Sequence, residues 1–196
     1  MLIWITAPDT FSNSALLSQL SSAVLGGGGS VAYIDLDTTF SGYLSSGIMN
    51  VKRSEGLTVL RPQANNLREV MVDVLSSEHD NYELIILDSL TALYHLCSNG
   101  RELRKTPILM GSYIALFKSM NMRQNSRLIV TSLLSSRRAP EQEGGKWIDA
   151  PTGKRIMTKI SDVTLEITSD ISEIEVKVTS HPKPEQKNMV YKLHLS

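Results

Sequence analysis

The sequence predicts an α/β domain built on a mostly parallel sheet. Three observations carry this prediction: short apolar segments alternate with longer segments of helical period, a helix directly follows the first apolar segment, and the C-terminal part changes to apolar–polar alternation. A length of 196 residues fits one domain with a core of useful size. We therefore expect residues 1–196 to form a single domain.

The expected elements follow in order along the chain. A strand at residues 2–7 precedes a helix at 13–25, in which leucine and valine recur at helical spacing and which the glycines at 26–29 end. Further strands are expected at 30–37, 57–62, 82–88 and 126–134, and further helices at 65–77 and 107–125. Pro107 suits the first turn of the last helix. Strands joined in this way form right-handed parallel crossovers.

The C-terminal segments differ in kind from the rest. Residues 161–168, 172–180 and 188–196 alternate apolar and polar side chains between short polar turns, which predicts antiparallel strands at a sheet edge. The tract at 181–187 holds two prolines and two lysines and suits a hairpin connection at that edge.

Composition limits the function classes. Twenty basic and 20 acidic residues balance, so binding to nucleic acid or to a membrane surface needs a local patch. Cys97 is the only cysteine and lies in an apolar run, which indicates a buried thiol and a reducing compartment. No segment reaches the roughly 18 apolar residues of a membrane span. We expect an intracellular protein without a membrane partner, cytoplasmic in a prokaryote or nuclear in a eukaryote.

Polar side chains recur at the carboxyl ends of the predicted strands, where ligands bind in parallel sheets. Residues 7–14 follow the first strand, Asp35 and Asp37 end the second, Asp88 ends the strand at 82–88, and Ser132 lies near the end of the strand at 126–134. Acidic groups therefore recur where a magnesium–phosphate site would lie. The other interpretation is that these carboxylates are solvated or cap the following helices.

The order of these pieces resembles the RecA-like recombinase superfamily, and most closely its archaeal RadA and RadB members and related paralogs. VAYIDLDTTF (31–40) is similar to the strand that bears the catalytic acid, YELIILDSLTALY (82–94) to the Walker B strand, and RLIVTS (127–132) to the sensor strand. The similarity extends over nearly the whole chain. It implies a RecA-like P-loop ATPase core.

The phosphate loop departs from the family's pattern G-x-x-x-x-G-K-[ST]. Ala7 and Ser12 stand at the glycines and Asn13 at the lysine, and only Ser14 fits. Glycines let backbone N–H groups surround the phosphates, and lysine supplies a cation. Losing a charge-assisted contact of about 1.5–3 kcal/mol predicts at least roughly tenfold weaker binding. Alternatively, the helix dipole still holds an anion. A further hypothesis is that Asn13 and Ser12 bond the strand-end carboxylates and close the site.

Other catalytic positions implied by the resemblance are also altered. Asp37 stands where the family has a glutamate that orients water, whereas Asp88 keeps the Walker B position. Leu133 falls near the glutamine sensor, and His181 near a basic residue that in some relatives reaches a neighbour's nucleotide. We therefore expect a pseudo-ATPase with no catalytic residue, no metal site and no cofactor, with binding of ATP and magnesium doubtful. The degenerate nucleotide site comprises Ser12, Asn13, Ser14, Asp37 and Asp88.

Two basic segments, 98–105 and 135–159, correspond to the family's DNA-facing loops. Cationic side chains there would neutralise phosphates while Trp147 stacks on a base, so that single strands bind without sequence readout. The expected DNA-binding residues are Arg101, Arg104, Lys105, Arg137, Arg138, Lys146, Trp147, Lys154 and Arg155. The other interpretation is a solvated charged surface with Trp147 packed beneath the loop.

The resemblance and the departures together predict a recombinase paralog with little or no ATPase activity. It would assist homologous recombination and DNA repair through single-stranded DNA and a recombinase or paralog partner. The family polymerises through a segment ahead of the core, and we expect no filament from this chain alone because none precedes Leu2. Two alternatives stay open: a weak ATPase completed by a partner subunit, and a KaiC-like regulatory protein that acts without DNA.

Overall fold

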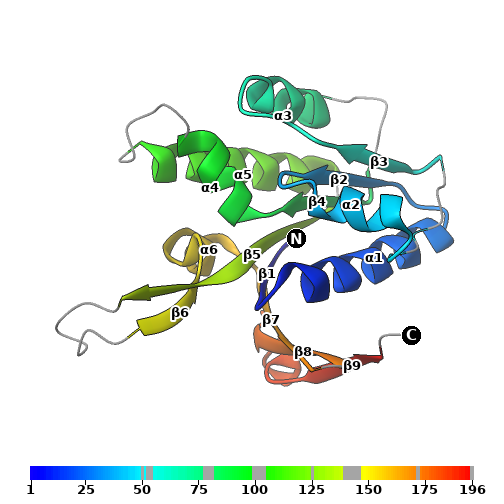
Figure 1. Ribbon diagram of the computed structural model, residues 1–196, viewed down its shortest axis with the longest axis vertical. Coiled ribbons are helices and arrows are strands. Elements are labelled where there is room, and N and C mark those ends of the chain that lie inside the picture. Colours follow the sequence, from blue (N-terminus) through cyan, green and yellow to red (C-terminus); the bar gives the residue numbers. More distant parts are fainter. Residues whose placement is uncertain are drawn as a thin grey trace.

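The computed structural model describes residues 1–49, 51, 55–76, 82–98, 105–124, 126–138, 147–170 and 173–194, and of residues 75–76, 120–124 and 137 only the backbone. The elements (Figure 1) are β1 (Leu2–Ala7), α1 (Thr10–Gly26), β2 (Val31–Asp35), α2 (Thr39–Ser46), β3 (Leu57–Leu60), α3 (Leu67–Ser76), β4 (Leu84–Asp88), α4 (Leu90–Ser98), α5 (Thr106–Gln124), β5 (Arg127–Arg138), β6 (Trp147–Pro151), α6 (Lys154–Ile160), β7 (Val163–Ser169), β8 (Glu173–Ser180), the 3₁₀ turn η2 (Pro184–Gln186) and β9 (Val190–His194). The expected α/β class is confirmed.

One sheet runs through the molecule in the strand order β3-β2-β4-β5-β1-β7-β8-β9, with β6 paired to β5 outside this path. Strands β3 to β7 along this order are parallel, whereas β7, β8 and β9 pair antiparallel. The expectation that 161–168 starts an antiparallel group is wrong for its pairing with β1. The helix α6 precedes β7 and returns the chain in the direction of β1, so that antiparallel pairing begins only at the β7–β8 connection.

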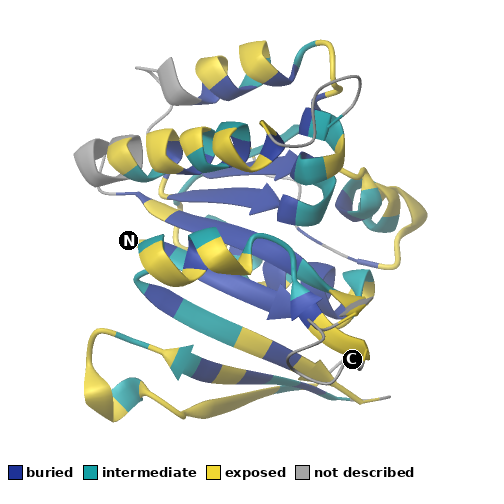
Figure 2. Cartoon of the chain, turned by 90° about the vertical axis from the view of Figure 1, so that its left-hand side faces the viewer, coloured by how far each residue is buried: buried dark blue, intermediate teal, exposed yellow. Residues whose placement is uncertain are grey.

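Helices cover both faces of the central strands, which therefore read as apolar runs rather than as alternating ones. Successive side chains of a strand point to opposite faces, so Ile34 packs with α3, α4 and α5 while Tyr33 packs with α1 and α2. Figure 2 shows the central strands buried along their length, whereas the C-terminal strands carry alternating exposure. This alternation matches the pattern that the sequence displays there.

The segment 135–159, expected as a long loop, contains three elements. Strand β5 continues to Arg138 and pairs antiparallel with β6, and α6 follows. We name β5 from Leu134 onward together with β6 the β5–β6 hairpin; Figure 1 shows it extending away from the helices. Its residues 135–138 are polar on both faces, so the alternation that marks a half-buried strand is missing from the sequence.

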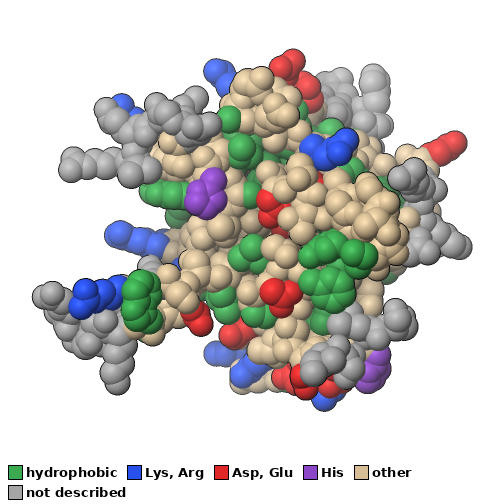
Figure 3. Space-filling view, in the orientation of Figure 1, with side chains coloured by type: hydrophobic (Ala, Val, Ile, Leu, Met, Phe, Trp, Pro, Cys, Tyr) green, Lys and Arg blue, Asp and Glu red, His purple; other side chains and the backbone are tan. Residues whose placement is uncertain are grey.

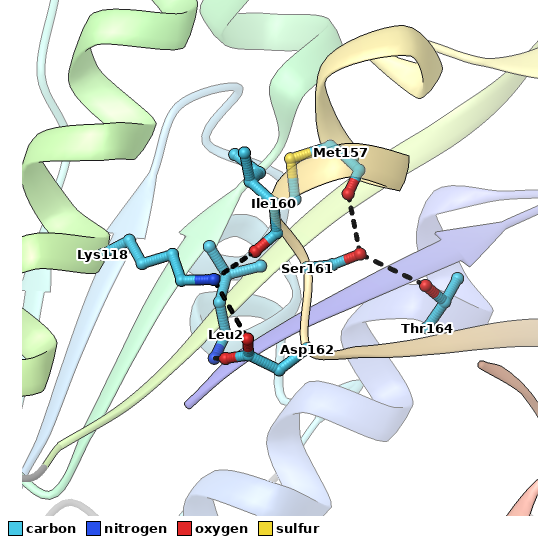
Figure 4. Close-up of polar contacts among 7 residues, drawn as sticks. All are labelled: Leu2, Lys118, Met157, Ile160, Ser161, Asp162 and Thr164. Carbon is cyan, nitrogen blue, oxygen red and sulfur yellow. Dashed lines mark hydrogen bonds and ion pairs between the residues drawn. The ribbon is translucent and has the colours of Figure 1, made fainter. Parts of the chain in front are cut away.

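A polar clasp anchors the C-terminal end of α6 (Figure 4). Lys118 of α5 donates to the carbonyl oxygen of Ile160 and to Asp162 Oδ1, the latter at 3.0 Å, and Asp162 Oδ2 accepts from the Leu2 N–H at 2.7 Å. Partial burial raises the pKa of Asp162, but the hydrogen bonds from Leu2 and Lys118 outweigh it and the pKa lies below its ordinary value. The clasp holds α6 against α5 and β1, and so fixes where its first turn lies.

Two compositional expectations can be compared with the structure. The thiol of Cys97 is buried, with 3% of the residue exposed, as expected. Among the helices of the described residues, none is long and apolar enough to cross a bilayer.

Candidate nucleotide site and basic face

The chain enters α1 from β1 through an internal cap rather than an open phosphate loop. Asp9 caps the helix: its Oδ1 accepts from the Ser12 N–H and its Oδ2 from the Ser12 hydroxyl, each at 2.8 Å. Ser12 therefore bonds Asp9 and not the strand-end carboxylates, as one hypothesis had it. A carboxylate thus occupies the positive end of the helix dipole, where the family's loop would hold a phosphate.

This capping carboxylate is ionised at neutral pH. Partial burial raises the pKa of Asp9, but hydrogen bonds from Ser12 and Ser169 outweigh burial, and the pKa lies below its ordinary value. Ser169, the last residue of β7, donates its hydroxyl to Asp9 Oδ2 over 3.1 Å. The N-terminus of α1 therefore carries a fixed negative charge that opposes a second anion.

Asp88, at the position expected for a Walker B carboxylate, is buried at the end of β4 and accepts hydrogen bonds from three side chains. Its Oδ1 accepts from Asn13 Nδ2 at 2.8 Å and from the Thr131 hydroxyl at 2.6 Å, and its Oδ2 from the Tyr33 hydroxyl at 2.5 Å. The bond expected between Asn13 and a strand-end carboxylate is present. Tyr33 and Thr131 meet Asp88 because all three lie on the α1-facing side of neighbouring strands, and Asn13 approaches from the first turn of α1.

None of these three partners carries a charge, so no cation offsets the rise that burial produces in the pKa of Asp88. Burial raises the pKa to about 6, while the bonds from Thr131 and Tyr33 lower it and the nearby Asp37 and Asp35 raise it. Burial and Asp88 together raise the pKa of Tyr33 well above 10, so its hydroxyl remains a donor. At neutral pH an ionised Asp88 is held by neutral dipoles alone, and below about pH 6 it takes up a proton.

The other two strand-end carboxylates bond the start of α2. Asp35 is fully buried, and its Oδ2 accepts from the Ser41 N–H at 2.8 Å and from the Ser41 hydroxyl at 2.6 Å. Burial raises its pKa against these bonds. Asp37 is exposed and accepts from the Thr39 N–H at 3.0 Å. The capping interpretation therefore describes Asp35 and Asp37, whereas Asp88 is neither solvated nor a cap.

The residues present do not fit the phosphates of a nucleotide. Asn13 supplies no cation and is bonded to Asp88, Pro8 has no N–H to donate, and the carboxylate of Asp9 holds the helix N-terminus. Among the described residues, no group of three or more His, Cys, Asp or Glu side chains is placed to hold a metal ion. Three buried oxygens of the site, Asn13 Oδ1, Ser14 Oγ and Asp35 Oδ1, have no hydrogen-bond partner within the described part of the chain.

Five of the residues expected to bind DNA are described with their side chains, and they lie on the side of the molecule that carries α6 and the β5–β6 hairpin. Arg138 and Trp147 are cross-strand partners in the hairpin, and Trp147 is 73% exposed. The interpretation that Trp147 packs beneath a loop is therefore wrong. Lys154 and Arg155 lie exposed in the first turn of α6, and Lys105 is exposed directly before α5. Figure 3 shows Lys and Arg side chains projecting from this side, on the left of the view.

The remaining expected DNA contacts cannot be placed. Arg101, Arg104 and Lys146 lie outside the described residues, as does the side chain of Arg137.

Sequence reasoning missed Asp9, Tyr33 and Thr131. The spacing of Asp9 and Ser12 is a capping pattern that could have been found. Tyr33 precedes Asp35 by two residues and so shares its face, but its bond to Asp88 depends on the pairing of β2 with β4.

Comparison with known protein families places the chain. The Rad51 family model matches residues 10–195, from the start of α1 through the whole of β9, and the chain belongs to this family. A search of curated proteins gave no match. The chain is therefore a recombinase-family protein with a RecA-like core.

Proposed function

We propose that this Rad51-family chain assists homologous recombination and DNA repair as a paralog with little or no ATPase activity. It acts by contacting single-stranded DNA and a recombinase or paralog subunit. The observation that carries the proposal is the hydrogen bond that Asn13, at the position of the family's lysine, donates to the buried Asp88.

Binding a nucleotide at this site would require three unfavourable changes. The Asn13–Asp88 bond would break, leaving a buried carboxylate short of a donor at a cost of about 1–3 kcal/mol. The phosphates would approach the ionised Asp9 at the helix N-terminus. No lysine at position 13 would offset their charge. The missing cation also disfavours the phosphoryl-transfer transition state, which positive charge stabilises.

The β5–β6 hairpin supports the DNA contact. An exposed tryptophan beside an arginine offers a stacking platform with a phosphate-binding cation, and this pairing binds single strands without reading their sequence. Because β6 is held by backbone pairing to β5, Arg138 and Trp147 are positioned without a nucleotide.

A second candidate function, a weak ATPase completed by a partner subunit, is favoured by one observation. The unpartnered oxygens of Ser14 and Asp35 face buried surroundings, and oxygen is the ligand that magnesium prefers. Ser14 is also the one position that fits the family's loop. On this alternative a basic residue of the partner would replace the missing lysine.

The nucleotide part of the proposal is tested by titrating a fluorescent ATP analogue with magnesium and by measuring phosphate release. The wild type and Asp88→Asn should both show no saturable binding and no turnover. Magnesium-dependent turnover that Asp88→Asn abolishes would select the weak ATPase instead.

The DNA part is tested by fluorescence anisotropy of a labelled oligothymidine at two salt concentrations, with and without ATP. We expect salt-sensitive binding that ATP leaves unchanged and that Arg138→Ala with Trp147→Ala weakens about tenfold or more. Lys192→Ala, which removes an exposed cation on β9, is the matched control and should leave binding unchanged. No DNA binding, together with capture of a partner unrelated to recombination, would select the regulatory alternative.

A further inference from the structure

A groove of about 1040 Å³ lies between α4, the first turn of α5, the base of the β5–β6 hairpin and α6; we call it the α4–α6 groove. Five large apolar side chains line it, namely Tyr94, Pro107, Met110, Pro151 and Ile156, beside polar residues that include Thr91, Thr152 and Thr158. The volume is at the upper end for sites that take small ligands, which favours a larger occupant.

Two smaller hollows continue the groove around the start of α5. One of about 370 Å³ shares Pro107 and Ile156 with it, and one of about 340 Å³ lies beyond Ile108. Ile108 is 70% exposed and lines both smaller hollows. An apolar side chain this exposed, between connected hollows, marks an extended binding surface rather than a closed pocket.

The rim of this surface is cationic. Lys154 and Arg155 line the groove, and Lys159 and Lys105 line the smaller hollows. Among the described residues that line the three hollows there is no aspartate or glutamate. The complement of an apolar floor with a positive rim is a segment with apolar anchors on one face and carboxylates on the other.

The floor favours aliphatic side chains over nucleic-acid bases. Bases stack on aromatic faces, but Trp147, the exposed aromatic residue of the hairpin, is not among the lining residues. The ring of Tyr94 already makes an edge contact with His95, with centroids 5.9 Å apart. The other large apolar residues of the lining are proline, methionine and isoleucine, which pack well against leucine-like or phenylalanine-like anchors.

We infer that the α4–α6 groove is a docking site for an acidic amphipathic peptide segment of a partner protein. Its apolar anchors fill the groove and flank Ile108, while its carboxylates pair with Lys154, Arg155 and Lys159. The inference does not depend on whether the nucleotide site is active, and the surface is distinct from the Arg138–Trp147 pair.

The test is selection of a random 16-residue peptide library displayed on phage against the full chain, followed by anisotropy titration of the enriched peptides. We expect enriched peptides to be acidic, with apolar residues at helical spacing. Ile108→Ser with Ile156→Ser should weaken their binding at least tenfold, and Arg155→Glu should do the same. The matched control is Leu116→Ser, which alters another exposed apolar side chain of α5, 45% exposed and outside the three hollows.

Three results would overturn the inference. Peptides without enrichment in acidic residues, or peptides whose affinity the groove variants leave unchanged, would show that the groove does not recognise this chemistry. Loss of oligothymidine binding in Ile108→Ser with Ile156→Ser would instead make the groove part of a nucleic-acid surface. Ile108→Ser and Ile156→Ser leave Arg138 and Trp147 of the hairpin unchanged. A wild type that does not bind oligothymidine would therefore refute the proposed DNA contact without refuting the peptide site.

Discussion

Replacing Asp88 by asparagine should remove a specific part of the pH dependence of folding stability. Asparagine keeps the shape of the side chain and removes its titration. In the wild type the folded-state pKa of about 6 exceeds the ordinary value of 3.8, so the folded protein binds this proton more tightly than the unfolded chain. The stability that this proton contributes is fully present below pH 3.8 and is lost as the pH rises through 6.

The magnitude follows from the two pKa values. A difference of this size corresponds to about 3 kcal/mol when the titration is complete, and roughly 2 kcal/mol of it falls between about pH 4.5 and 7.5. Groups remote from Asp88 contribute equally in both proteins and cancel in the comparison. The free energy of unfolding of the wild type should therefore fall by roughly 2 kcal/mol more than that of Asp88→Asn across this window.

The assay is urea unfolding followed by circular dichroism at several pH values within the window. Glu69→Gln is the matched control because Glu69 is an exposed carboxylate of α3, whereas Asp37 itself raises the pKa of Asp88. Its pH dependence should follow that of the wild type. Parallel curves for the wild type and Asp88→Asn would refute the reasoning, since they would show that burial does not raise the pKa of this carboxyl.

Three further substitutions test other parts of the structure by urea unfolding. Lys118→Met should lower stability by about 1–3 kcal/mol, because Asp162 and a carbonyl lose their donor; an unchanged midpoint would show that the clasp is not formed. Phe40→Ala should lower the free energy of unfolding by about 3–5 kcal/mol, since its buried ring stacks on Tyr33 with centroids 3.8 Å apart. A loss below about 0.5 kcal/mol, as is usual for a surface substitution, would contradict this packing. Gly153→Ala should cost at least about 1–2 kcal/mol, because φ is +75° and the new Cβ would lie 2.8 Å from a leucine of α4; a stabilised variant would exclude this backbone conformation.

The strands of the sheet were predictable from sequence because their signal is strong and local. The strand at 2–7 matches β1 at both ends, and 82–88 contains β4, since buried parallel strands are continuous apolar runs. Helices α2 and α4 were not predicted, because they follow strand-end residues that sequence analysis assigned to the ligand site. The short β6 was missed because it lies within a polar segment and is defined by its pairing with β5.

The candidate site was predictable in its positions and not in its bonds. Alignment to the family's loop pointed to Asn13 and Ser12 as partners of strand-end carboxylates, which holds for Asn13 alone. Ser12 bonds Asp9 instead, because Asp9 lies three residues before it and caps the helix. Thr131 joins Asp88 through the registry of β4 with β5, which no single-strand pattern encodes.

One strand, β5, passes through both the carboxylate network and the hairpin without interruption. Thr131 donates to Asp88, and seven residues further along the same strand Arg138 faces Trp147. At about 3.3 Å per residue the two positions are roughly 23 Å apart along a hydrogen-bonded strand. If the strand moves as a rigid segment, a tilt of about 5° at Thr131 would displace Arg138 by roughly 2 Å. A small change in the packing of the core would therefore produce a larger displacement at Arg138 and Trp147.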